Sequence, residues 1–219
     1  SSGAFVTTEK KEIHNTDLNN RGDAKVQTIT SFITDDNGSV YDLVTYQELT
    51  NRTFDSDRNI KNQMILTYDT FLETKILLDC QEIRSIGFSS SGVALRQVIA
   101  TFVDASKSED SLLDVKVIEN SDISLQGYVG RSIVTRYDGL TDYSDTTGAL
   151  EPDLLKIVDR QLIETKLFDP RGNALEQWTT RYYYDEKGVE TFSEAQKVFT
   201  DSYDIHDRAQ ASYIRSYTD

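Results

Sequence analysis

The chain has 219 residues, a length that fits one or two domains and favours one if the chain is all-β. Hydrophobic residues make up 37% and charged residues 27%, which is too apolar for a disordered acidic tail but lean for a thick globular core. The formal net charge of −14 repels phosphate backbones, so no nucleic-acid partner is expected. No apolar run approaches the roughly 18 residues of a membrane helix, so no membrane insertion is expected either.

Residues 1–24 are polar and carry no hydrophobic periodicity. We therefore expect a linker or loosely ordered arm over 1–24, followed by one domain over 25–219. Stretches rich in β-branched and aromatic residues predict the strands of that domain. These stretches are residues 25–34, 41–48, 63–68, 93–103, 114–119, 132–137, 177–184 and 190–199.

Acidic turns between the predicted strands offer the hard oxygen ligands that Ca²⁺ prefers. Asp35, Asp36 and Asn37 form one candidate group, and Asp142 and Asp145 form another. Carboxylates that are simply solvated in turns are the explanation we prefer for these residues. Calcium is the one cofactor that the sequence leaves open.

Residues 151–165 fit two structures. Apolar residues at 154, 155, 158 and 162, with Pro152 near the start, fit a short helix. The spacing of the repeated turns favours a strand that runs into Phe168, and a strand is the structure we prefer.

The familiar signatures of catalysis are absent from the sequence. Cys80 is the single cysteine, and its neighbours Leu77, Leu78 and Ile83 predict a small buried hydrophobe. His14 and His206 lie far apart, and the 37 acidic residues single out no pair for glycoside hydrolysis. We expect no catalytic residue and no enzyme activity.

An aromatic residue followed by aspartate recurs along the chain, more often than composition predicts. The dipeptides begin at Tyr41, Phe54, Tyr68, Tyr137, Phe168, Tyr184 and Tyr203. In the two clearest copies, glycine stands four residues after the aromatic, at Gly172 and Gly188. An aromatic residue suits the end of a half-buried strand, aspartate bonds nearby backbone amides, and glycine supplies the positive φ of the turn. Each copy therefore predicts a β-hairpin turn.

Between the two clearest turns, residues 177–184 alternate like a strand. The alternation puts Trp178, Tyr182 and Tyr184 on one face and Tyr183 on the other, beside Arg181. The three aromatic residues are candidates for binding a glycan or another apolar ligand. The same pattern also fits the core face of a sheet, with Tyr183 turned to solvent.

The segment from Phe168-Asp-Pro-Arg-Gly172 to Tyr184-Asp-Glu-Lys-Gly188 resembles the YD repeat of the RHS and teneurin-like families. In that pattern a Tyr-Asp-x-x-Gly turn alternates with a strand that ends in Tyr-x-Tyr-Asp. The close match covers residues 168–188, and residues 104–131 lack the motif. The resemblance implies stacked hairpins in a large secreted or cell-surface protein. It carries over no functional residue.

The fold class that follows is all-β, with consecutive antiparallel hairpins in an extended or curled sheet. A closed barrel or a two-sheet sandwich is the alternative. The chain ends on Ser216-Tyr217-Thr218-Asp219, which matches the start of another repeat and predicts a fragment of a longer chain.

The leading functional hypothesis is a structural segment of a larger extracellular or cell-surface protein. Its partners would be other segments of the same chain or other surface components. A binding module for a glycan or an apolar ligand is the second hypothesis, and a glycoside-processing enzyme is the third.

Overall fold

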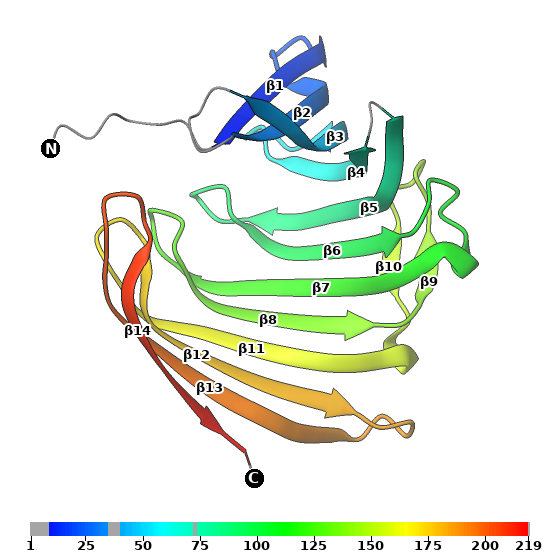
Figure 1. Ribbon diagram of the computed structural model, residues 1–219. Helices are drawn as coiled ribbons and strands as arrows, with labels where there is room; N and C mark the ends of the chain where they lie inside the picture. Colours follow the sequence, from blue (N-terminus) through cyan, green and yellow to red (C-terminus); the bar gives the residue numbers. More distant parts are fainter. Residues whose placement is uncertain (1–8, 35–39, 72–73, 219) are drawn as a thin grey trace, which may run out of the picture. The chain divides into compact units, whose positions relative to one another are not determined.

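The computed structural model describes residues 9–34, 40–71 and 74–218. The fold is all-β: twelve strands form one antiparallel sheet in the order β1-β2-β3-β4-β5-β6-β7-β8-β11-β12-β13-β14, and β9 and β10 pair separately (Figure 1). Apart from the β9–β10 pair, strands that follow one another in the chain are neighbours in the sheet, which confirms the prediction of consecutive hairpins. The sheet is not closed into a barrel, so that alternative is wrong.

Fourteen strands lie within the described residues. They are β1 Glu9–Leu18, β2 Ala24–Thr34, β3 Tyr41–Phe54, β4 Ile60–Phe71, β5 Thr74–Phe88, β6 Ala94–Phe102, β7 Leu112–Ile123, β8 Val129–Tyr137, β9 Leu140–Tyr143, β10 Leu150–Pro152, β11 Ile157–Phe168, β12 Ala174–Tyr184, β13 Glu190–Tyr203 and β14 Ala209–Tyr217. Two single-turn 3₁₀ helices, η1 Glu109–Ser111 and η2 Leu154–Lys156, precede β7 and β11.

The chain divides into two compact units. The first contains residues 1–83 and 100–113, and the second contains residues 84–99 and 114–219. β5 and β6 contribute residues to both units. The candidate aromatic residues all belong to the second unit.

The predicted arm is wrong for residues 9–18, which form β1 and pair with β2 from Glu9↔Ile33 to Leu18↔Ala24. Nearly every residue of β1 is exposed, because it is an edge strand with water on both faces. Such a strand has no buried face and so shows no apolar alternation in its sequence. β1 is a strand because its backbone pairs with β2, and backbone pairing requires no pattern of hydrophobic side chains.

Seven hairpin turns among the described residues share one hydrogen-bonding pattern. In each, the backbone N–H of the first residue donates to the carbonyl of the fifth, and the N–H of the fourth donates to the carbonyl of the first. The turns cover residues 19–23, 55–59, 89–93, 124–128, 169–173, 185–189 and 204–208. This is a type I turn followed by a left-handed residue, a common short connection between antiparallel strands.

The side chain of the first residue holds each of these turns closed. In the turn after β12, Asp185 Oδ1 accepts hydrogen bonds from the backbone N–H groups of Lys187 and Val189, both at 2.9 Å. Asn19 Oδ1 makes the same two bonds in the turn after β1, and Ser89 Oγ accepts the second of them after β5. The predicted role of aspartate as an acceptor for nearby amides is therefore confirmed in the turns after Phe54, Phe168, Tyr184 and Tyr203. The prediction of a turn is wrong for Tyr41-Asp42 and Tyr68-Asp69, which lie within β3 and β4 and pair with neighbouring strands.

The fourth residue of each turn has a positive φ, from +59° at Asp207 to +93° at Gly172. Glycine adopts this region without steric cost, which explains its place four residues after the aromatic. Arg58 and Asp207 occupy the same position without being glycine. The turn therefore tolerates other residues, and only some copies of the repeat are readable from the sequence.

Neighbouring turns of the second unit contact one another along the edge of the sheet that carries them (Figure 1). The Tyr128 ring stacks on Phe168 at 5.5 Å, and its hydroxyl donates to the Pro170 carbonyl at 3.2 Å. Further along, the Arg171 guanidinium lies 2.8 Å from the Asp207 carboxylate. These contacts join consecutive hairpins to each other through their loops.

The segment 151–165 is mainly a strand, as preferred. β11 begins at Ile157, and only the single turn η2 precedes it. Leu154 and Leu155 are 69% and 94% exposed, so the apolar spacing that suggested a helix does not correspond to a buried helix face. Asp153 caps the turn by accepting a hydrogen bond from the Leu155 N–H.

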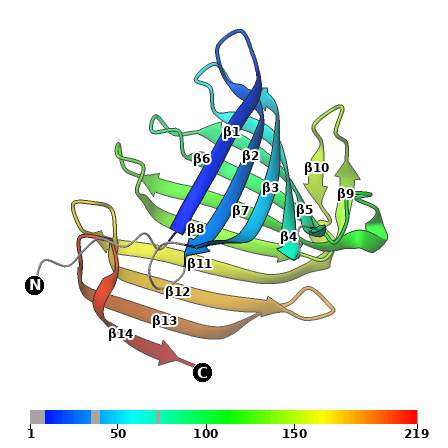
Figure 2. The same cartoon turned by 45° about the horizontal axis from the view of Figure 1, so that its top comes forward.

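The buried hydrophobic residues described in the second unit come from β6, β7 and the β9–β10 hairpin. Val98, Val115 and Leu150 are almost fully buried. The hairpin lies beside the end of β8 and the start of β11 (Figures 1 and 2). The Arg84 guanidinium donates from Nε to the Gly148 carbonyl at 2.9 Å and so ties β5 to the hairpin loop.

The first unit encloses a charged cluster. Glu82 is fully buried and accepts two hydrogen bonds from Arg52, at 2.7 and 2.9 Å, and one from Lys107 at 2.9 Å. A carboxylate taken out of water needs such partners, because desolvation of an unpaired charge is costly. Cys80, two residues earlier on β5, is also fully buried, as predicted.

Burial raises the pKa of the Cys80 thiol to about 11, and the nearby Glu82 carboxylate adds to this effect. At pH 8 only ~0.1% of such a thiol is ionised, and no solvent reaches it. We therefore predict that a thiol-specific disulfide reagent reacts with Cys80 at pH 8 at least about a hundredfold more slowly in the folded chain than in the urea-unfolded chain. Equal rates in the two states would contradict the burial of Cys80.

The turn glycines supply a matched pair of substitutions. Alanine at Gly188 adds a Cβ with no atom within 4 Å, so Gly188→Ala should cost only the left-handed backbone, about 1 kcal/mol. Alanine at Gly172 places the Cβ 2.3 Å from the Tyr128 ring and must displace it from Phe168 and Pro170. Gly172→Ala should therefore lower the free energy of unfolding by about 1–2 kcal/mol more.

Urea denaturation of the two variants measures this difference. Equal destabilisation would show that the contact between the turns at 124–128 and 169–173 contributes nothing to stability.

Candidate functional site

The predicted aromatic trio lies on one face of the sheet in the second unit. Cross-strand pairing places Trp178 opposite Lys197, Tyr182 opposite Phe192 and Tyr184 opposite Glu190. On the next strand Phe199 faces Tyr213, and Tyr217 lies two residues beyond Arg215. We call this surface the aromatic face. It consists of Trp178, Tyr182, Tyr184, Phe192, Phe199, Tyr213 and Tyr217.

Lysine side chains cover the ring of Trp178. Lys197 Nζ lies 3.7 Å from the ring centroid, and Lys166 Nζ lies 5.3 Å from it. The indole N–H donates to Glu176 Oε1 at 2.7 Å, which fixes the orientation of the half-buried ring. Cation–π contacts of this kind stabilise an exposed site by about 0.5–1 kcal/mol each.

Tyr182 and Tyr184 are held in a similar way. The Arg160 guanidinium lies 4.8 Å from the Tyr182 ring centroid, and Phe192 meets that ring edge-on. The Tyr184 hydroxyl donates to Glu190 Oε1 at 2.5 Å, and the same carboxylate pairs with Arg160. Burial raises the pKa of Tyr184, and the hydrogen bond to Glu190 raises it further.

The alternation predicted for residues 177–184 is confirmed. Trp178, Tyr182 and Tyr184 are all half-buried, whereas Tyr183 lies on the opposite face and is 49% exposed. The rings do not stand free, because cations of neighbouring strands contact Trp178 and Tyr182. The aromatic face is therefore a mixed aromatic and cationic surface, which residues 177–184 alone could not reveal.

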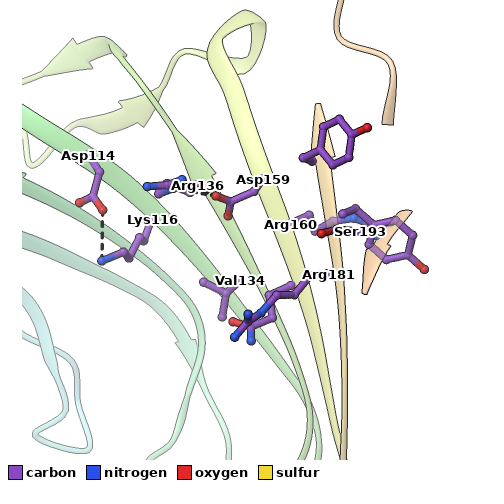
Figure 3. A pocket seen from close by; sticks show the side chains of 11 residues that line it. Asp114, Lys116, Val134, Arg136, Asp159, Arg160, Arg181 and Ser193 are labelled. Carbon is purple, nitrogen blue, oxygen red and sulfur yellow. Dashed lines mark hydrogen bonds and ion pairs between the residues drawn. The ribbon is translucent and has the colours of Figure 1, made fainter. Parts of the chain in front are cut away.

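The opposite face of the second unit carries a groove of about 520 Å³ (Figure 3). Its floor comes from β7, β8, β11, β12 and β13. The lining residues of that face are Asp114, Lys116, Val134, Arg136, Asp159, Gln161, Arg181, Tyr183 and Ser193. Arg160 and Tyr182 also border the groove, although strand alternation places their side chains on the aromatic face.

Charges in the groove are paired across or along strands. Lys116 Nζ lies 3.1 Å from Asp114, Arg136 Nε donates to Asp159 at 2.9 Å, and Arg181 Nη1 lies 2.5 Å from Glu194. Cross-strand pairing aligns Lys116, Arg136 and Asp159 in one row. The groove is thus a polar surface with four basic and two acidic lining residues, and Glu190 and Glu194 beside it pair with Arg160 and Arg181. Sequence reasoning missed it, because five separate strands build it.

The calcium candidates remain without support. Asp35, Asp36 and Asn37 lie outside the described residues. Asp145 accepts a hydrogen bond from the Tyr143 hydroxyl at 2.7 Å and lies 3.9 Å from Arg84. Within the part of the chain that the structure describes, no three His, Cys, Asp or Glu side chains gather as a metal site requires.

Comparison with known proteins gives no family. No protein-family model matches the chain, and no curated protein matches it. Over the described ranges, the structure contains no helix with the length and apolar character to span a membrane.

Proposed function

We propose that this chain is a non-enzymatic structural segment of a larger secreted or cell-surface repeat protein. The observation that carries the proposal is the shared turn, in which one side chain and one left-handed residue close seven hairpins alike. Such a unit can be repeated along a chain with little demand on the rest of the sequence. Each hairpin contacts mainly its neighbours, as in other repeat architectures.

The two edges of the sheet support a role in which another strand is added. β1 carries Glu9, Lys10, Lys11, Glu12 and Asp17, and charged side chains on an edge discourage pairing with other strands. β14 carries one charge, at Arg215, and no proline. All nine residues of β14 are exposed.

β14 is therefore the edge that accepts a further strand, from the same long chain or from another surface component. An unprotected edge presents a row of backbone N–H and C=O groups to any extended segment. The alternation of β14 continues the aromatic face through Tyr213 and Tyr217 and places Ile214 on the other face. A strand added here would cover apolar side chains on both faces.

The edge can be tested through self-association of the chain. We expect sedimentation velocity in 0.5 M NaCl, which screens the net charge, to show reversible association that strengthens with protein concentration. Ile214→Lys should weaken it about tenfold or more, because a charge on the open edge opposes pairing. Ile214 is 64% exposed, so the substitution should not disturb the fold.

His14→Lys on β1 is the matched control, since it adds the same charge to the other edge and should leave association unchanged. A wild-type chain that stays monomeric at millimolar concentration would contradict the proposal. Equal association of wild type and Ile214→Lys would contradict it as well.

A further inference from the structure

Lys197 and Arg215 lie directly opposite each other on β13 and β14. Like charges directly opposite each other repel and destabilise a strand pair. Among the described residues neither cation forms an ion pair with an acidic side chain, in a chain whose net charge is −14. We call these two residues the cationic pair.

Aromatic rings surround the cationic pair. Lys197 Nζ lies 3.7 Å from the Trp178 ring centroid and 5.4 Å from that of Tyr217. The Arg215 guanidinium carbon lies 5.8 Å from the Phe199 centroid. Cation–π attraction offsets part of the repulsion but adds no negative charge.

The surface around the pair is open to ligands. Tyr213 and Tyr217 flank Arg215 at alternate positions of β14 and are 60% and 43% exposed. Each tyrosine lies two strand positions from Arg215, about 7 Å between Cα atoms, so the two tyrosines are about 13 Å apart. The aromatic face therefore presents two cations beside the exposed rings of Tyr213 and Tyr217.

We propose that the cationic pair and its flanking tyrosines bind an acidic saccharide through the carboxylate of a uronate unit. The planar Arg215 guanidinium can donate two parallel hydrogen bonds to a carboxylate, and Lys197 can donate to the same group. The sugar ring then lies against Tyr213 or Tyr217, whose rings supply apolar surface and whose hydroxyls can hydrogen-bond. Inorganic phosphate would use the cations but none of this ring surface.

This site is separate from the edge of β14, because it uses side chains of one face and no free backbone group. It therefore goes beyond the structural role and can fail independently of it. The surrounding negative charge of the protein weakens binding of any polyanion. We accordingly expect a modest affinity that falls as salt is added.

Trp178 is the single tryptophan of the chain and contacts Lys197, so its fluorescence reports binding. We expect a saturable change on titration with trigalacturonate and none with the fully methyl-esterified trimer, which keeps the rings and lacks the charge. Arg215→Gln should raise the dissociation constant at least about tenfold, because it removes the bidentate donor. Arg215 lies two strands from Trp178 and over the Phe199 ring, so the fluorescence readout survives the substitution.

Lys116→Gln is the matched control, since it changes the net charge equally but lies in the groove on the opposite face. It should bind the trimer like the wild type. Equal binding of the methyl ester, or unchanged affinity in Arg215→Gln, would overturn the proposal. An equal response to inorganic phosphate at matched charge would also overturn it, by showing a simple anion patch.

Discussion

The hydrogen bonds that backbone amides donate to the first side chain of each turn are the constraint on which the rest of the sheet depends. They fix where each hairpin reverses and therefore which residues pair across it. Side chains alternate between faces with a period of two, so a slip of one residue would exchange the faces completely. The aromatic face and the polar groove both exist because the turns hold this register.

Buried apolar residues are few, and this places more weight on local interactions. The described core consists of small clusters such as Val98, Val115 and Leu150, while β11 to β14 have no fully covered face. Among these strands, cationic side chains and ion pairs contact the aromatic rings in place of a second layer of packed apolar side chains. The stabilising contacts therefore join mainly adjacent strands, which is the arrangement expected of a repeated structural segment.

The sequence predicts what is local and misses what depends on pairing. Aspartate and glycine at fixed spacing predict the turns at 169–173 and 185–189, and alternation predicts the face of Trp178. The turn at 89–93 has Ser89 in the position of aspartate, so the aromatic-aspartate pattern does not mark it. β1 is exposed on both faces, so its sequence has no apolar alternation that would predict a strand. The repulsion between Lys197 and Arg215, 18 positions apart, becomes visible only when the register of β13 and β14 is known. The groove likewise gathers residues from five strands, so no single segment predicts it.

The most direct test of the turn constraint is amide hydrogen exchange at Lys187 and Val189, whose N–H groups donate to the Asp185 carboxylate. Asp185→Ala should accelerate exchange of both amides at least about tenfold relative to the wild type. Asp185→Asn should preserve the protection, because Asn19 makes the same two bonds in the turn after β1. Unchanged exchange in Asp185→Ala would show that the side chain does not hold the turn and that the register of the hairpin does not depend on it.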